Sequence, residues 1–273
     1  MVRISQVAVL SLVLVGVPCR ALGQSDPAPA PPASETRAAE PAARLADGPA
    51  ASDGAAPSPS LAATFTSLGV DLRRMFSTAN AGLAMAFGGS ALAAAPWDAA
   101  AVSEGRELPA GLFKPGNVTG ALVTQMGAGF GAFAIGKATG SDRLALVGSH
   151  IVRAQIASQL VVQSLKVATD RSRPDGSNSF SLPSGHAASA FATAAVLQRD
   201  FGWKVGIPAY ALGAYVAAAR VGSSKHYLSD VILGAAVGVV AGRAVTVGSR
   251  KVKFDLSVAP TAGGAALMFT KRP

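Results

Sequence analysis

Residues 166–186 decide the fold of this chain and carry most of its chemistry; they read KVATDRSRPDGSNSFSLPSGH. The Pro174-Asp175-Gly176 turn ends the helical pattern before it, because proline disfavours a helical conformation in the preceding residue and lacks a backbone donor. Pro183 likewise prevents a helix from starting before Ser184. The stretch therefore predicts a helix over 142–168, a short loop, and a second helix that begins at Ser184.

The same helical periodicity, interrupted by Pro and Gly breakers, extends outward from this stretch and begins at Leu61. We therefore predict an all-α fold. The expected helices span 62–76, 79–95, 118–138, 142–168, 184–199, 203–220 and 227–247. In the last of them, Gly234, Gly238 and Gly242 recur every four residues and leave one flat face. We assign this face to close packing against another helix.

The two ends of the chain differ from this helical domain, which we place at 61–249. Residues 1–23 combine an early basic residue, an apolar stretch and a small-residue cleavage site, which predicts a secretory signal peptide. Residues 24–60 are rich in Pro and Ala with almost no large apolar side chains, which predicts a disordered linker. Alternating apolar residues over 252–258 predict a short β-hairpin in the tail, 250–273.

The chain is half hydrophobic and carries a net charge of +9, with 20 Lys and Arg against 10 Asp and Glu in residues 61–273. Such a surplus attracts phosphorylated substrates or an anionic membrane. Nucleic acid is disfavoured, because no reading motif or basic run interleaved with aromatics occurs. The single cysteine, Cys19, lies in the expected signal. Disulfides, thiolate metal sites and cysteine nucleophiles are therefore excluded from the mature chain.

Two groups of residues suit the binding of a phosphate. Lys166, Arg173 and Arg220 supply three positive charges, and the planar fork of an arginine binds two oxygens at once. Ser184 and Gly185 lie where a helix begins, so that its free N–H groups and its dipole favour an anion. These five residues are our candidate phosphate ligands.

The chain has three histidines, and two of them, His186 and His226, lie close in sequence to these candidate phosphate ligands. His226 and Asp230 are one helical turn apart, so in a helix the carboxylate can accept the Nδ1–H and leave Nε2 free to attack. His186 then remains as the general acid that protonates the leaving oxygen. His150 belongs to no motif and is expected to be structural.

The segments that carry these residues are spaced to meet. From His186, one helix runs to the turn near Gly202 and another returns to Arg220, each about 16 residues or about 24 Å long. The two equal legs bring Arg220 back to the end where His186 lies. We therefore expect one site at one end of a helical bundle.

Three blocks carry a family resemblance: Lys166 to Pro174, Pro183 to His186, and Arg220 with His226 and Asp230. They resemble the signature of the type 2 phosphatidic acid phosphatases (PAP2), which vanadium haloperoxidases and bacterial class A acid phosphatases share. The resemblance implies a PAP2-type bundle of about six core helices, with no metal and no cofactor. It implies His226 as nucleophile, Asp230 as its partner and His186 as acid. The phosphate would be held by Lys166, Arg173, Ser184, Gly185 and Arg220.

One departure from the family pattern is Ala219, where the family usually has a serine before the arginine. The resemblance predicts a metal-independent phosphatase that acts on a lipid phosphate, an isoprenoid pyrophosphate or a soluble phosphomonoester through a phosphohistidine. Two alternatives remain open: a vanadate-dependent haloperoxidase, and a catalytically silent envelope protein of the same fold. The sequence leaves the oligomeric state undetermined.

The expected location is the cell envelope or periplasm, with the site outside the cytoplasm. Apolar helices and basic loops at the far end from the site favour an integral membrane bundle. Helix 142–168 argues against this, because Arg143, His150, Arg153 and three glutamines are costly in lipid. We interpret Gln155, Gln159 and Gln163 as a solvated face in preference to a substrate channel. The balance favours an extracytoplasmic helical domain associated with the membrane.

Overall fold

The computed structural model describes residues 60–246, 253–261 and 264–272. The predicted signal peptide, the linker up to residue 59 and residues 247–252 lie outside the described residues. The boundaries that we assign to the domains therefore stay predictions.

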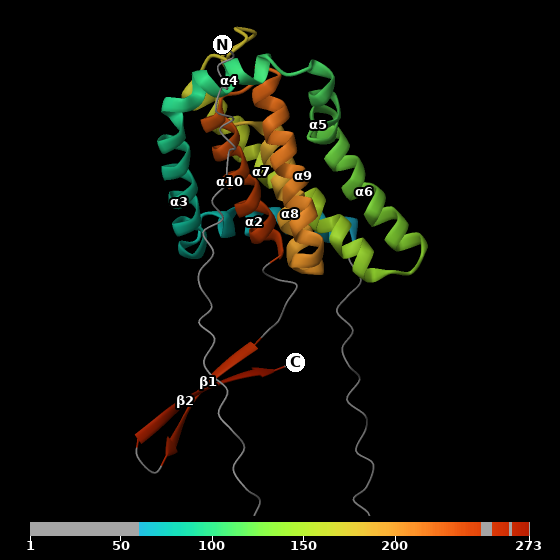
Figure 1. Cartoon of the computed structure of the whole chain (residues 1–273). Helices are drawn as coiled ribbons and strands as arrows, with labels where there is room; N and C mark the ends of the chain where they lie inside the picture. Colours follow the sequence, from blue (N-terminus) through green and yellow to red (C-terminus); the bar gives the residue numbers. More distant parts are fainter. Residues whose placement is uncertain (1–59, 247–252, 262–263, 273) are drawn as a thin grey trace, which may run out of the picture. The chain divides into compact units, whose positions relative to one another are not determined.

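The helical part runs from Leu61 to Thr246 and is followed by two strands. Its elements are α1 (Leu61–Thr66), α2 (Leu68–Met75), α3 (Thr78–Ala94), η1 (Ala95–Trp97), α4 (Asp98–Arg106), η2 (Ala110–Phe113), α5 (Lys114–Thr119), α6 (Leu122–Ala138), α7 (Asp142–Thr169), α8 (Gly185–Phe201), α9 (Trp203–Gly222) and α10 (Leu228–Thr246). Six long helices, α3 and α6 to α10, form a bundle in which α8 and α10 pack together, as do α6 and α7 (Figure 1). The all-α prediction is confirmed.

The helices differ from the prediction mainly around the proline-containing stretch between α3 and α6. We took Pro96 and Pro115 as breakers, but each lies in the first turn of a helix, η1 and α5 respectively. Proline fits there because the first helical N–H groups have no partner within the helix. These short elements, with α4 and η2, were missed. They lie at the end of the bundle where α8 and α10 begin (Figure 1).

The glycines of α10 pack against α8, as predicted. A Cβ on Gly234, Gly238 or Gly242 would lie 2.4, 2.2 or 2.6 Å from the carbonyl oxygens of Ser184, Ala188 and Ala192 respectively. No side chain fits at such distances. The two helices are therefore in contact along one face, and the start of α8 is fixed beside the start of α10.

The tail contains the predicted hairpin. Strand β1 (Lys253–Thr261) pairs antiparallel with β2 (Gly264–Arg272), with Leu256 opposite Phe269.

Within the described residues, three helices are long and apolar enough to cross a membrane, namely α7, α9 and α10. The bent pair Ala110–Thr119 and Leu122–Ala138 is a fourth candidate if it counts as one span. Large apolar side chains are exposed on the outer helices, for example Leu92 on α3, Val123 on α6 and Ile207 on α9. Exposed apolar surface of this extent suits contact with lipid.

Most of the polar residues of α7 that argued against a membrane bundle have partners inside the protein. The side chain of Gln155 donates to the Ser189 carbonyl at 2.9 Å, and that of Gln159 donates to the Gly185 carbonyl at 3.1 Å. Arg153 makes a two-pronged ion pair with the buried Asp71. Our interpretation of a solvated face is therefore wrong for Gln155 and Gln159, although Gln163 is exposed.

A histidine of α7 gives the same result. His150 is buried, and its Nδ1 lies 2.9 Å from the Asp200 carboxylate. Charged and polar side chains that satisfy one another inside a bundle are tolerated in a membrane. The structure thus favours an integral membrane bundle over the extracytoplasmic domain that we preferred.

Candidate functional site

Ser184 begins α8 and ties it to the start of α10. Its backbone N–H donates to the carbonyl of Asp230 at 2.9 Å, and its hydroxyl accepts from the N–H of Ala187 at 3.5 Å. Gly185 follows, where an added Cβ would lie 3.3 Å from Oε1 of Gln159. The first turn of α8 is therefore fixed from two sides while its N-terminus stays available to an anion.

His226 lies in the loop between α9 and α10, and its side chain is 2% exposed. Its Nδ1 lies 2.7 Å from the carbonyl oxygen of Ser181. Because a carbonyl only accepts, Nδ1 carries the proton and Nε2 keeps a lone pair. We expected Asp230 to accept this proton, but its nearest oxygen is 3.7 Å away, since His226 precedes the helix instead of lying one turn back within it.

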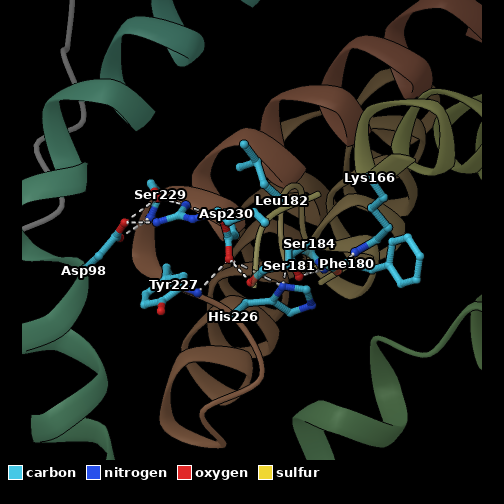
Figure 2. A network of polar contacts seen from close by, with 12 residues as sticks. Asp98, Lys166, Phe180, Ser181, Leu182, Ser184, His226, Tyr227, Ser229 and Asp230 are labelled. Carbon is cyan, nitrogen blue, oxygen red and sulfur yellow. Dashed lines mark hydrogen bonds and ion pairs between the residues drawn. The ribbon is translucent and has the colours of Figure 1, made fainter. Parts of the chain in front are cut away.

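Asp230 is completely buried and is held by donors other than His226. Its Oδ2 accepts from the Ser181 hydroxyl at 2.5 Å and from the backbone N–H of Tyr227 at 2.8 Å. Its Oδ1 accepts from Nη1 of Arg171 at 2.6 Å. Figure 2 shows this carboxylate at the centre of a polar network that joins the loop before α8 to the start of α10.

Arg171 connects Asp230 to a second carboxylate, Asp98 at the start of α4. Its Nη2 donates to Oδ2 of Asp98 at 2.8 Å, and its guanidinium lies 4.3 Å from the ring centre of Tyr227. Asp98 also accepts from the backbone N–H and the hydroxyl of Ser229, at 2.8 and 2.6 Å. Sequence reasoning left Arg171 without a role and missed Asp98, which no motif marks.

His186 lies in the first turn of α8 and is half-buried. Burial lowers its pKa to about 4, and the positive charge of Arg220 and the nearby His226 act in the same direction. Burial also lowers the pKa of His226 to about 4, with further lowering by Lys166 and Arg220 against the opposing effect of Asp230. The two imidazoles therefore share one electrostatic environment and are neutral at pH 7.

Arg173 and Arg220 both have donors without a hydrogen-bond partner. Within residues 60–246, the Nε of each is buried and unpaired, which is uncommon and costly unless a ligand completes the site. Nη1 of Arg220 donates to Oδ1 of Asn117 at 2.8 Å. Lys166 Nζ donates to the carbonyl of Phe180. Cations with spare donors at a helix N-terminus form a place for a phosphate group.

Asn117 is another residue that sequence reasoning missed, because it lies outside the three blocks that carry the family resemblance. It lies on α5, and besides holding Arg220 it donates from Nδ2 to the hydroxyl of Ser223 at 2.9 Å. The nearby Gly116 faces Ala219: an added Cβ on Gly116 would lie 2.6 Å from Cβ of Ala219. Helix α5 thus packs closely against α9 beside Arg220.

Comparisons with known proteins agree with the resemblance found in the sequence. The model of the PAP2 superfamily matches residues 149–253. The lipid A 1-phosphatase of Porphyromonas gingivalis is 35% identical over 85 residues, which are 30% of this chain and 19% of that protein. The chain thus matches about a fifth of the length of this curated relative.

One solved structure is also similar. It is a transmembrane PAP2-type phosphatidylglycerolphosphate phosphatase from Bacillus subtilis, with a TM-score of 0.46 and 19% identity. The match covers 70% of this chain and 96% of that one.

Proposed function

Because residues 149–253 match the model of the PAP2 superfamily, we propose that this chain is a phosphatase that hydrolyses phosphate monoesters through a phosphohistidine on His226. One observation carries the proposal. His226 is buried with its proton held on Nδ1 by the Ser181 carbonyl, and its backbone N–H donates to the carbonyl of Arg220. The buried Nε of Arg220 lacks a partner, as does that of Arg173. A lone pair on Nε2 beside an anion site is what attack on phosphorus requires.

The first step forms a bond between Nε2 of His226 and phosphorus while the bond from phosphorus to the ester oxygen breaks. His186 gives its proton to that oxygen, and the alcohol leaves. Lys166, Arg173 and Arg220 bind the phosphoryl oxygens and stabilise the charge that spreads over them in the transition state. His226 becomes cationic, and the Ser181 carbonyl and the Asp230 carboxylate stabilise it.

In the second step, water attacks the phosphorus and His186 accepts a proton from it. The bond between nitrogen and phosphorus breaks, its electron pair returns to Nε2, and inorganic phosphate leaves. The same residue thus acts first as acid and then as base.

The substrate itself raises the pKa of His186. In the free protein its pKa is about 4, lowered by burial and by Arg220 and His226. A bound phosphate dianion offsets these positive charges and favours the protonated imidazole. The acid is therefore charged when the leaving oxygen needs a proton.

We propose a lipid phosphate as the substrate and an integral membrane location with the site outside the cytoplasm. The exposed apolar side chains of α3, α6 and α9 and the candidate spans support the membrane location. The relative from Porphyromonas gingivalis, described as a lipid A 1-phosphatase, supports a phosphorylated lipid. The basic residues distal to the site, such as Arg143 and Arg199, favour the cytoplasmic side for that end.

Kinetics with two leaving groups test the proposal. His226→Ala should lose activity by at least about a thousandfold, because no other group replaces the nucleophile. His186→Asn should lower kcat/KM, which reports the steps up to release of the alcohol, by about a hundredfold or more with an alkyl phosphate and far less with p-nitrophenyl phosphate, whose leaving group needs no proton. Undiminished turnover in His226→Ala would sink the proposal, and equal losses of kcat/KM on both esters would remove His186 as the acid.

A further inference from the structure

The carboxylate of Asp230 reaches the nucleophile only through another residue. Its Oδ2 is 3.7 Å from Nδ1 of His226, which is too long for a hydrogen bond. Ser181 touches both groups: its hydroxyl donates to Oδ2 of Asp230, and its carbonyl accepts the Nδ1–H of His226 at 2.7 Å. Ser181 therefore stands between the charge and the imidazole (Figure 2).

The position of Asp230 depends in turn on Arg171. A carboxylate that is 0% exposed needs a close counter-charge, and Nη1 of Arg171 at 2.6 Å supplies it. Arg171 is itself fixed by Asp98 at 2.8 Å and by the face of Tyr227. The charges alternate from Asp98 to Arg171 to Asp230, and each link is shorter than 3 Å.

Asp98 brings in a part of the chain that lies outside the PAP2 match. It is the first residue of α4, and it also accepts two hydrogen bonds from Ser229, the neighbour of Asp230. Helix α4 is thereby attached to the first turn of α10. Among the described residues, the bonds to Arg171 and Ser229 are the contacts that stabilise the buried carboxylate of Asp98.

We propose that Asp98, Arg171 and Ser181 are positioning residues that hold Asp230 at a fixed distance from His226. This inference rests on the proposed function. In this arrangement the negative charge of Asp230 is divided among Arg171, Ser181 and Tyr227. The charge of Asp230 stabilises the cationic phosphohistidine but leaves the free imidazole of His226 neutral.

The acid limb of kcat/KM reports this arrangement, because the free enzyme needs a neutral His226. The charged or titratable groups that act on His226 are Lys166 from α7, Arg220 from α9, Asp230 from α10 and the neighbouring His186 of α8. Removing the cation from Asp230 leaves its negative charge uncompensated, which favours the imidazolium. In a variant without this cation, the acid limb of kcat/KM should therefore move to higher pH.

The experiment compares pH profiles of Arg171→Gln, Arg171→Lys and Ser181→Ala in the full-length protein. For Arg171→Gln we expect the acid limb to rise by about one pH unit, kcat to fall about tenfold to a hundredfold, and KM to stay within about twofold. Arg171→Lys should recover part of both effects, because it keeps the charge but reaches only one carboxylate. Ser181→Ala should shift the limb in the same direction by a smaller amount.

Asp98 is tested by a double-mutant cycle. Because it reaches Asp230 only through Arg171 and Ser229, Asp98→Asn should lower kcat less than Arg171→Gln does. The loss in the double variant should be clearly smaller than the product of the two single losses, because the part of the effect of Asp98 that passes through Arg171 is already gone. Additive losses would show that Asp98 acts independently and would overturn its place in the network.

Two variants elsewhere in the bundle serve as controls. Arg153→Lys weakens another buried arginine pair, with Asp71, and Ser158→Ala removes another buried hydroxyl, which bonds within its own helix. Both should lower the melting temperature without changing kcat or the acid limb of kcat/KM.

The inference fails if the Arg171 and Ser181 variants behave like these controls while His226→Ala is inactive. If His226→Ala retains activity, the proposed function fails as well, so the two failures are distinct. Should Arg171→Gln not fold, Arg171→Lys decides.

Discussion

At the scale of single residues, the two histidines are alike in pKa but opposite in what they must do. Burial lowers both values to about 4, yet in the proposed mechanism His226 must be neutral to attack and His186 must be protonated to act as acid. The free protein cannot satisfy both conditions at neutral pH without its substrate. The phosphate therefore has a part in setting the protonation state of the site.

This conflict predicts an acidic pH optimum. Below about pH 4 His226 becomes protonated, so kcat/KM should fall as the pH is lowered. Above about pH 4 the free enzyme loses the proton of His186, so kcat/KM should also fall towards alkaline pH. The alkaline limb of kcat should lie at higher pH than that of kcat/KM, because bound phosphate raises the pKa of His186. Rates measured from pH 3.5 to 9 check this, and His186→Asn should flatten the alkaline limb.

Stability must be followed in the same experiment, since it changes over the same range. Between about pH 4 and the ordinary histidine pKa of 6.5, the unfolded chain binds more protons at these two positions than the folded one. The free energy of unfolding therefore rises with pH in this window and is lost as the pH falls through it. Melting curves at each pH separate this loss from the protonation of His226. A rate that tracks the melting curve alone would contradict the assignment.

At the scale of elements, α10 is built to let α8 approach it. The start of α8 holds Ser184 and His186, and the start of α10 holds Asp230, so the contact between the two helices sets the site. The glycine face of α10 is the reason that their backbones meet. Any side chain on this face has to separate them.

Gly238→Ala tests this contact. Its Cβ would lie 2.2 Å from the carbonyl of Ala188, and overpacking of this kind costs about 1–3 kcal/mol. The control is Gly82→Ala in α3, where an added Cβ meets nothing within 4 Å and should be neutral or stabilising by about 0.5–1 kcal/mol. Thermal or denaturant unfolding of both variants measures this difference in stability. Equal stability would mean that the helices move apart freely.

Helix α5 contributes to the site from outside the matched residues, and Asn117 is its contact. Because its Oδ1 fixes Nη1 of Arg220 at 2.8 Å, Asn117→Ala should weaken phosphate binding and raise KM about tenfold, with a smaller change in kcat. Thr124→Ala, which removes an exposed hydroxyl bonded to the Val118 carbonyl at the start of α6, is a suitable comparison. A kcat effect without a KM effect would place Asn117 in the chemical step instead.

At the scale of the whole molecule, the pattern of breakers predicted the long helices well. Both ends of α7, α8 and α9 lie within two residues of the expectation. The error lay in α1 to α5, where Pro96 and Pro115 open helices, and a proline alone does not say which end of a helix it marks. The β-hairpin followed from its alternation.

The family motifs mark the candidate site residues, but the residues that hold these candidates in place carry no signal in the sequence. Asp98 and Asn117 lie more than a hundred residues from the partners they bind in α10 and α9. Nothing local distinguishes them from surface residues. Ser181 acts partly through its backbone carbonyl, which no pattern of side chains reveals. The polarity of α7 misled us in the same way, because Gln155 and Arg153 find partners on other helices.

The candidate membrane-spanning helices predict that the whole protein is anchored in the membrane. If α7, α9 and α10 cross the membrane with their apolar neighbours facing lipid, the protein should stay in the membrane fraction after alkaline carbonate washing. Detergent should be needed to release it. Release by carbonate alone would instead favour an extracytoplasmic domain that is only associated with the membrane.

The most direct test of the central claim is to trap the intermediate. The protein is mixed for milliseconds with a substrate that carries a labelled phosphoryl group, and the reaction is stopped in alkaline detergent. We predict label on the peptide that contains His226, stable to alkali and lost in acid, and absent from His226→Ala. Label on another residue, or turnover by the wild-type protein with no label at any quench time, would contradict the account.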